Sequence, residues 1–272
     1  MENVTFIIPI HVYNKTVEPF IKRAFESLKN AKDIDKCKTI IIGTAAAVKK
    51  AESLYTLVGC PQELTTIVNT ETEFCTQINK ASLACLTKYF TVLEFDDAIY
   101  PYWGTLMDRY TKAEKGVSAY LPIAELVKAE VKNDTVTTSI LAYINEIAWA
   151  TAFANEPGYL DKDCLETYMD FFADGGLIKT EDFIAVGGLK PSLKLAAWYE
   201  FMLRLCHKEK RIFIIPRIGS QHTVGREGSY MVDTQKNISQ AEGQWLIKTA
   251  KQEYFFKEDR NKKFSDVDAV SE

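Results

Sequence analysis

Three carboxylates follow one apolar run in the middle of the chain. The run Phe90–Leu93, continued by Phe95, is β-branched and aromatic, which predicts a buried strand. Glu94, Asp96 and Asp97 stand together at the carboxyl end of this strand. Clustered carboxylates are costly to bury unless a cation or hydrogen-bond donors meet them. The pattern therefore indicates either a hard-cation site for Mg²⁺ or Mn²⁺, or an acidic surface turn before the next helix.

The segments that lead to this acidic cluster alternate between strand and helix. Strands are expected at 4–10, 39–42 and 64–68, and helices at 17–28 after Thr16 as the cap, at 45–57 and at 75–88. This order predicts a mostly parallel sheet with helices on both faces. Ligands bind at the carboxyl ends of the strands in such sheets. Residues 1–100 are therefore expected to form a nucleotide-binding half.

The period of the sequence changes after the acidic cluster, which predicts an antiparallel extension of the sheet over 101–226. We expect strands at 117–131, 135–144, 147–153, 177–179 and 211–216, helices at 103–113, 164–172 and 193–206, a helical turn capped by Thr180, and a loop at 221–226. Residues 1–240 are predicted to form a single α/β domain. Residues 241–272 are predicted to form a helix to Phe256 and a charged, disordered tail from Lys257.

The composition of the chain gives no sign of general nucleic-acid binding, of a membrane span, or of a zinc or redox motif. The chain has 272 residues and a net charge of -4, which gives no electrostatic footprint for general nucleic-acid binding. No apolar run approaches the length of a membrane span, and we see no signal peptide. The six cysteines are scattered without a CxxC pair, so neither a zinc site nor a redox motif is indicated. We expect reduced thiols and a cytoplasmic location.

Four short motifs follow one another between residues 4 and 226. They are the opening strand with Pro9 and Tyr13-Asn14, then Gln77-Ile78-Asn79-Lys80, then Glu94-Phe95-Asp96-Asp97 with Pro101, and last Gly187-Gly188-Leu189 with the helix through Leu203-Arg204. In this order they resemble a GT-A fold glycosyltransferase of the glycosyltransferase family 2 type. The resemblance implies a mostly parallel, Rossmann-like sheet with an antiparallel extension. It also implies transfer of a sugar from a nucleotide-diphosphate sugar donor to an acceptor hydroxyl, with Mn²⁺ or Mg²⁺ as cofactor.

The resemblance assigns expected roles on the donor side. Glu94 would face the donor ribose, and Asp96, with Asp97 beside it, would bind the metal. His222 would complete the metal site, or else be an exposed loop histidine. The remaining donor-binding candidates are Pro9, His11, Tyr13, Asn79 and Arg226. His11 would stack on the nucleobase or only line the strand end, and Arg226 would pair with a phosphate or remain an exposed loop cation.

Two departures from the family pattern bear on the chemistry. The second strand ends Ile42-Gly43-Thr44 without the usual aspartate, which leaves the donor nucleobase open. Ala197 and Trp198 stand where the family has Glu-Asp, so the usual catalytic base is missing. Three interpretations follow: a nearby carboxylate acts as the base, the enzyme retains configuration, or the protein only binds. The nearby carboxylates are Asp174, Glu181, Asp182 and Glu200, of which Asp174 and Glu200 are the catalytic candidates; Asp174 is favoured because it precedes the Gly175-Gly176 turn.

Residues on the acceptor side leave the acceptor itself unassigned. Gly175, Gly176, Trp198 and Tyr199 are the acceptor-binding candidates. The two aromatic residues form a stacking platform, or at least one of them packs in the core. A glycan, a protein, a lipid and a modified nucleobase all remain open as acceptors. The alternative functions are a catalytically inactive GT-A-like binding module and a nucleotidyltransferase, although the latter would normally show a glycine-rich basic loop after the first strand.

Overall fold

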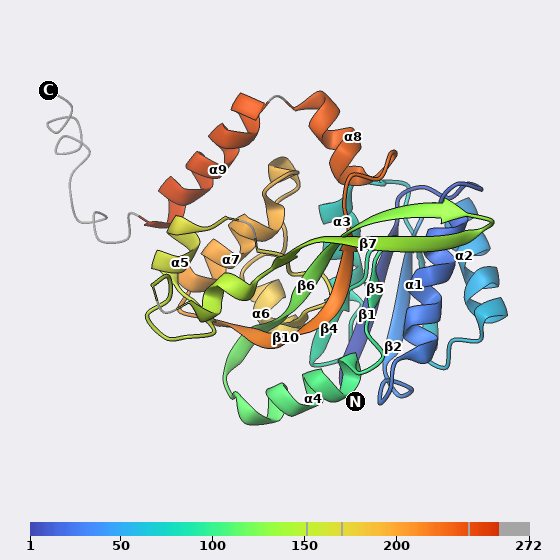
Figure 1. The fold of residues 1–272 in the computed structure, drawn as a ribbon, viewed down its shortest axis with the longest axis horizontal. Helices are drawn as coiled ribbons and strands as arrows, with labels where there is room; N and C mark the ends of the chain where they lie inside the picture. The colour runs from blue at the N-terminus through green and yellow to red at the C-terminus, as the bar shows by residue number, and fades with distance from the viewer. Residues whose placement is uncertain (151, 170, 239, 256–272) are drawn as a thin grey trace, which may run out of the picture.

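The computed structural model describes residues 1–150, 152–169, 171–238 and 240–255. One ten-stranded sheet runs through them in the order β3-β2-β1-β4-β9-β6-β10-β5, with β7 paired to β6 and β8 paired to β10 (Figure 1). The strands are β1 (Val4–Ile10), β2 (Lys38–Gly43), β3 (Glu63–Val68), β4 (Tyr89–Val92), β5 (Ala98–Ile99), β6 (Val117–Lys132), β7 (Thr135–Ile144), β8 (Tyr159–Leu160), β9 (Leu177–Lys179) and β10 (Arg211–Thr223).

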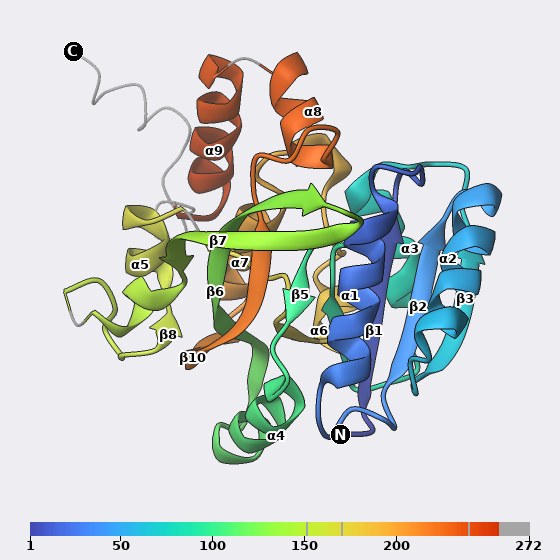
Figure 2. The same ribbon diagram turned by 45° about the vertical axis from the view of Figure 1, so that its right-hand side comes forward.

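Helices cover both faces of this sheet, as the sequence predicts. The helices are α1 (Glu18–Asn30), α2 (Ala45–Val58), α3 (Phe74–Leu83), α4 (Trp103–Ala113), α5 (Lys162–Thr167), α6 (Thr180–Ala185), α7 (Ala197–His207), α8 (Tyr230–Asn237) and α9 (Gln240–Phe255), with 3-10 turns η1 (Glu146–Trp149) and η2 (Pro191–Leu193). Side chains alternate across a strand. Phe6 and Ile8 of β1 therefore join the core under α1, α2 and α4, whereas Ile7 joins the core under α3 and α7 (Figure 2).

The first half of the sheet is parallel and the second half is mixed. β1 pairs in parallel with β2 and β4, and β2 pairs in parallel with β3. β9 lies antiparallel between β4 and β6, while β5, β7 and β8 add further antiparallel pairs. The predicted turn Asn133-Asp134 joins β6 to β7, and both residues have the positive φ that such tight hairpins need. The predicted α/β sheet with an antiparallel extension is confirmed.

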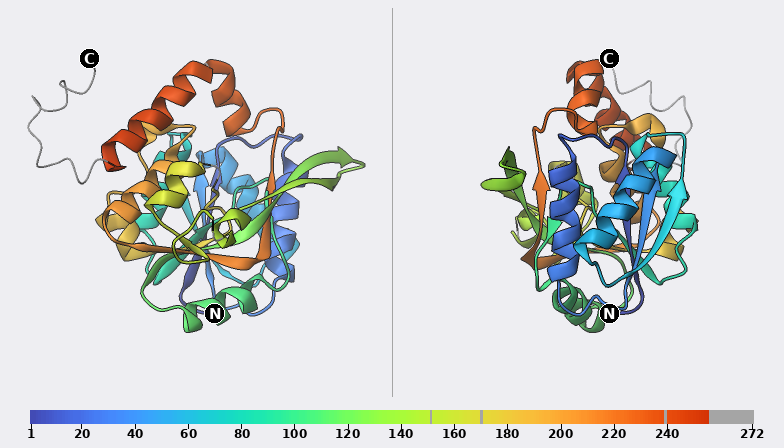
Figure 3. Two further views of the ribbon diagram at one scale, coloured as in Figure 1. Left: turned by 60° about the vertical axis from the view of Figure 1, so that its left-hand side comes forward. Right: turned by 90° about the vertical axis from the view of Figure 1, so that its right-hand side faces the viewer.

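The C-terminal helices form an arch above the carboxyl edge of the sheet (Figure 3). α9 packs on α7 and matches the predicted terminal helix, whereas α8 was not predicted. Phe256 and the predicted tail from Lys257 lie outside the described residues. Among the described residues, no helix has the length and apolar character needed to cross a membrane.

Several element boundaries differ from the sequence prediction because side chains rather than periodicity decide them. α1 begins at Glu18, since the Asn14 side chain, not Thr16, accepts the amides of Thr16 and Val17 at 2.9 and 3.1 Å. The predicted strand at 147–153 is instead η1 followed by a turn, with Thr151 outside the described residues. Asn145 causes this change: its φ of 73° ends β7, and its side chain bonds the Pro122 and Phe172 carbonyls.

Four further predictions about helices were too long or misplaced. α5 ends at Thr167 instead of reaching Phe172, and α7 begins only at Ala197 because the preceding residues form η2 and a turn. α3 ends at Leu83, five residues before the expected Lys88. Thr180 is the first residue of α6, and its hydroxyl donates to the Thr87 carbonyl instead of capping the helix.

Glu200 anchors α7 through a buried ion pair. The Arg204 Nε and Nη2 atoms donate to the two Glu200 oxygens at 3.1 and 2.6 Å, and Lys190 Nζ lies 3.0 Å from Oε1. Arg204 also donates to the carbonyls of Val186 and Gly188. The Glu200 side chain is completely buried, so this predicted catalytic candidate has both oxygens engaged inside the protein.

Replacing Glu200 by alanine is expected to lower the free energy of unfolding by about 3–5 kcal/mol, because Arg204 would remain buried without its carboxylate. Urea unfolding followed by circular dichroism measures this loss. Glu52→Ala, on the exposed face of α2, is the matched control and should change the value by no more than about 0.5 kcal/mol. Equal losses in the two variants would contradict a structural role for the ion pair.

Candidate active site

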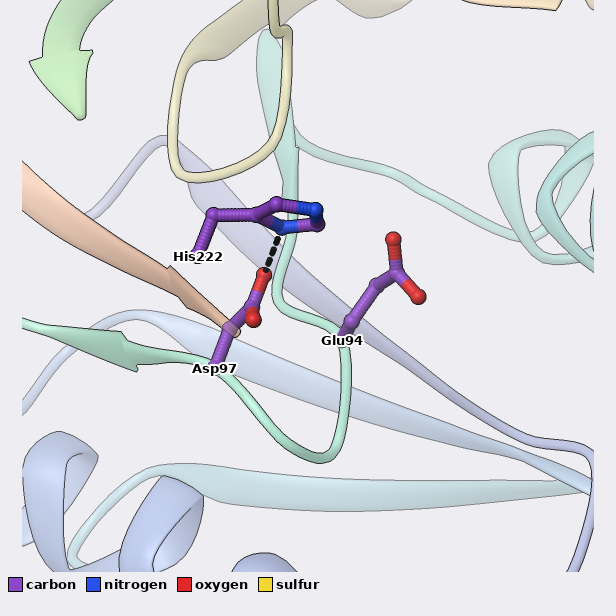
Figure 4. A group of neighbouring side chains, drawn as sticks. All are labelled: Glu94, Asp97 and His222. Atoms are coloured by element: carbon purple, nitrogen blue, oxygen red, sulfur yellow. Dashed lines mark hydrogen bonds and ion pairs between the residues drawn. The ribbon is translucent and has the colours of Figure 1, made fainter. Parts of the chain in front are cut away.

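Glu94, Asp97 and His222 meet at the carboxyl edge of the sheet (Figure 4). Glu94 and Asp97 lie in the turn between β4 and β5, and His222 lies near the end of β10. One potential ligand atom from each lies within 4.8 Å of the others. β10 runs to Thr223 instead of ending at Pro216, so His222 is held on a strand and not in the predicted loop. Two carboxylates and an imidazole suit Mn²⁺, and also Mg²⁺ if oxygen ligands from a substrate complete the shell.

Asp97 fixes the position of His222. Asp97 Oδ1 accepts the Thr223 amide at 2.8 Å, and Oδ2 lies 2.8 Å from His222 Nδ1. Figure 4 shows that the other ring nitrogen points toward the side where the Glu94 carboxylate lies. A carboxylate that holds one imidazole nitrogen in this way orients the other nitrogen for a metal.

Asp96 and Arg226 form an ion pair with one another. Arg226 Nε donates to Asp96 Oδ2 at 2.7 Å, and the guanidinium lies 5.3 and 5.1 Å from the ring centres of Phe20 and Phe95. The structure therefore places Asp96, predicted as the main metal ligand, outside the group of three. Arg226, predicted to meet a phosphate, here neutralises Asp96. Its Nη2 atom is buried without a hydrogen-bond partner among the described residues.

Arg23 joins the turn that carries the carboxylates to the strand that carries the histidine. Its guanidinium donates to the Asp96 carbonyl at 2.9 Å and to Gln221 Oε1 at 2.6 Å. The Thr223 hydroxyl also donates to the Asp96 carbonyl, at 2.5 Å. Sequence reasoning missed Arg23, because nothing in a helix pattern shows which segment lies opposite it.

Asp174 is the fourth carboxylate of the site. It is buried next to the glycine turn, whose Gly175 amide donates to the Val92 carbonyl of β4. Burial, and secondly the charge of Asp97, raise the pKa of Asp174 to about 7 against the opposing effect of His222. Its Oδ1 accepts no hydrogen bond of normal geometry from the described residues, although the Trp198 indole is near enough to favour the charged form.

The neighbouring carboxylates also shift the pKa values of Glu94 and His222. Burial, followed by the charges of Asp174 and Asp97, holds the pKa of Glu94 well above its usual range. Burial alone would lower the pKa of His222, but Asp97, Glu94 and Asp174 outweigh it and raise the value to about 10. The imidazole is therefore protonated at neutral pH when it has no metal, and it partly balances the carboxylates.

Of the predicted donor-side residues, His11 has a ring nitrogen that is unpartnered in the part of the chain that the structure describes, whereas Pro9 and Tyr13 are buried or bonded within the protein. His11 follows β1 with its ring centre 4.9 Å from Phe95 and 6.3 Å from Tyr230, and its Nε2 is buried without a partner among the described residues. Pro9 is buried inside β1, and the Tyr13 hydroxyl donates to Glu18 at 3.1 Å. Tyr230 comes from α8, the helix that sequence reasoning did not find.

Asn79 has a structural partner instead of an open side chain. Its amide nitrogen donates to the Leu189 carbonyl, and its amide oxygen accepts the Leu189 N–H, both at 2.7 Å. This reciprocal pair ties α3 to the Gly187-Gly188 turn. Asn79 was predicted to bind the donor, but in the structure both ends of its side-chain amide are used within the protein.

The predicted acceptor-side residues divide between site and core. Gly175 and Gly176 line the turn beside Asp174, where an added Cβ would lie 2.7 Å from Ser220 and 2.6 Å from Leu121, respectively. Trp198 lies near Asp174 and against Phe74, with ring centres 6.3 Å apart. Tyr199 points into the core, where its hydroxyl donates to the Leu165 carbonyl at 2.6 Å.

Solved structures share this arrangement of strands and helices. S. aureus TarS 1-349 in complex with UDP-GlcNAc matches with a TM-score of 0.63 and 11% sequence identity, over 92% of this chain and 65% of that chain. The same TarS segment in complex with UDP matches with a TM-score of 0.61 and 11% identity, over 95% of this chain and 73% of that chain. The chain has the GT-A fold.

A further structure of S. aureus TarS matches with a TM-score of 0.58 and 12% identity, over 97% of this chain and 46% of that chain. The chain thus spans less than two thirds of the first TarS structure. No protein-family model matches the sequence, and no curated protein does. The GT-A fold places Glu94, Asp97 and His222 at the sheet edge where ligands bind in open α/β sheets.

Asp174→Asn is expected to make the protein more stable relative to wild type as the pH rises from about 4 to about 7. The folded state keeps the Asp174 proton up to about pH 7, whereas the unfolded chain releases it near 3.8, so ionisation opposes folding between these values. The difference should grow by up to about 1.4 kcal/mol per pH unit and then level off.

Urea unfolding at pH 5 and pH 8 tests this expectation. The exposed Asp35→Asn is the matched control. A difference between Asp174→Asn and wild type that is the same at both pH values would mean that the Asp174 carboxyl does not titrate as its surroundings require.

Proposed function

We propose that this protein is a metal-dependent glycosyltransferase that moves a sugar from a nucleotide-diphosphate sugar, of the UDP-sugar class, to an acceptor hydroxyl. The observation that carries the proposal is the group Glu94, Asp97 and His222 at the ligand-binding edge of a GT-A fold. The complexes of TarS with UDP-GlcNAc and UDP support the donor class.

The donor diphosphate would bind where this group of three stands. When bound, Mn²⁺ or Mg²⁺ would offset the negative charge that develops on the diphosphate as its bond to the sugar breaks. Glu94 and the free nitrogen of His222 would hold the cation, and Asp97 would orient the imidazole and be close enough to join them. His11 and Tyr230 would lie along the donor, because His11 has a buried nitrogen without a partner among the described residues.

Asp174 would act as the base toward the acceptor. With a pKa of about 7 it is deprotonated in a large fraction of molecules at neutral pH and can still take up a proton. The acceptor oxygen attacks the anomeric carbon of the sugar, its proton passes to Asp174, and the bond from the sugar to the diphosphate breaks. Trp198 stands where the family has its base, and Asp174 reaches the space beside it from another loop.

The donor proposal predicts a ligand-dependent rise in the unfolding temperature. UDP-GlcNAc at about a hundred times its dissociation constant, with Mn²⁺, should add roughly 2.7 kcal/mol, which corresponds to a few degrees. Glu94→Gln should lose most of this shift and weaken Mn²⁺ binding in calorimetry by at least about tenfold. The exposed Glu146→Gln should retain both.

The absence of any shift with UDP, UDP-GlcNAc or other nucleotide sugars would rule out the transferase. A shift that does not need Mn²⁺ and survives Glu94→Gln would reject the metal site but keep the donor.

The base proposal predicts a loss of turnover without a loss of donor binding. Slow release of UDP from UDP-GlcNAc, with water as acceptor, is the assay. Asp174→Asn should lower the rate by about 10²–10⁴-fold and leave the donor-induced thermal shift unchanged. The wild-type rate should rise with pH to a plateau above about 7, because the base must be deprotonated.

The double variant Asp174→Asn with Trp198→Asp is compared with Asp174→Asn alone, because it restores a carboxylate at the position where the family has its base. We expect the double variant to recover part of the UDP-release rate that Asp174→Asn loses. An unchanged rate in Asp174→Asn would assign the base elsewhere, and donor binding without any UDP release would favour a binding module.

A further inference from the structure

β7 is exposed along most of its length. Seven consecutive residues, Thr137–Tyr143, are solvent-exposed, so neither face of this part of the strand is covered. Ile140, Leu141 and Tyr143 have 52%, 59% and 44% of their surface exposed. Strands are normally covered on at least one face, and three large apolar side chains on one short exposed segment are unusual for a chain that acts alone.

One edge of β7 is also unpaired in the part of the chain that the structure describes. β6 is its pairing partner there, and no other described strand lies beside it. The β6–β7 hairpin runs across the outside of the molecule, in front of α1 (Figures 1 and 2). The register shifts by one residue between Leu126 and Val127, which pair with Ala142 and Ile140, so Leu141 has no residue opposite it.

The strand has a bulge at Leu141, but it lacks two other features that protect such an edge. Natural sheets block free edges with charged side chains or proline. β7 reads TVTTSILAYI from Thr135 to Ile144 and contains neither. The charged residues of the two paired strands are all on β6, where Glu130 pairs with Lys128 at 3.1 Å and with Lys132 at 3.5 Å. β3 at the other end of the sheet, by contrast, carries Glu63 paired with Lys38.

We propose that β7 pairs antiparallel with the β7 of a second copy of this chain, which gives a twofold dimer. A strand on a twofold axis meets itself, so its unpaired N–H and C=O groups find matching partners in the identical edge. An uncharged strand pairs with itself without like charges facing each other, and Ile140 and Leu141 would be covered by the same residues of the partner.

The proposed dimer would also support the site. Ile140 and Ala142 pair with Val127 and Leu126 of β6, and these two residues pair with Thr223 and His222 of β10. A second β7 would therefore extend the sheet on the side of the strands that hold His222. The proposal does not depend on sugar transfer, because pairing of the two strands needs neither donor nor acceptor.

Light scattering after gel filtration, from about 1 to 100 µM, tests the proposal on the full chain, since mass action sets the dimer fraction. The wild type should reach the mass of two chains. Leu141→Asp should raise the dissociation constant of the dimer by at least tenfold. Leu57→Asp is the matched control, because Leu57 is 81% exposed on α2 and undergoes the same chemical change.

Hydrogen exchange at two protein concentrations gives a second readout. The amides of β7 should exchange more slowly at high than at low protein concentration. Ile140→Lys should abolish this dependence with an unchanged circular dichroism spectrum. A wild type that stays monomeric at 100 µM, or a dimer that Leu141→Asp and Leu57→Asp weaken equally, would overturn the proposal.

Discussion

The structure of the site depends on four carboxylates at one edge of the sheet, of which three are buried and Glu94 is half-buried. Glu94, Asp96, Asp97 and Asp174 approach one another there, and each raises the cost of ionising its neighbours. Such a cluster is stable only if cations and hydrogen-bond donors face it. Arg23 of α1 supplies these from one segment, and His222 and Arg226 supply them from the end of β10 and the loop that follows it, so the charge balance itself fixes how the two segments meet.

These four carboxylates differ in what surrounds them. Asp96 is neutralised by Arg226, and Asp97 is occupied by His222 and the Thr223 amide. Among the described residues, Glu94 and Asp174 have no cation of their own beyond His222, and their pKa values are raised most clearly. The two best-satisfied carboxylates therefore suit holding the architecture, and the two least-satisfied ones suit binding a cation or accepting a proton. This division supports the roles that we propose for them.

The fold of this chain is more similar to that of TarS than the sequence is. The two structures match with a TM-score of 0.63 over 92% of this chain, although only 11% of residues are identical. A fold tolerates such change because burial and alternation, not particular side chains, determine which strands pair. A base needs only to reach the acceptor oxygen. In the function that we propose, the Asp174 carboxylate would take this part in place of a carboxylate at the start of α7, where Trp198 stands.

The sequence by itself determined the alternating strands and helices of residues 1–100, the hairpin at Asn133-Asp134 and the position of the acidic cluster after β4, because hydrophobic period and turn chemistry are local properties. It did not determine that Asp96 meets Arg226, that Glu200 and Asn79 are engaged inside the protein, or that His222 lies on a strand. These outcomes follow from contacts between segments more than a hundred residues apart, or from side chains that only close packing brings together. Only the tertiary structure decides which buried charges find a partner, because that depends on distance in space.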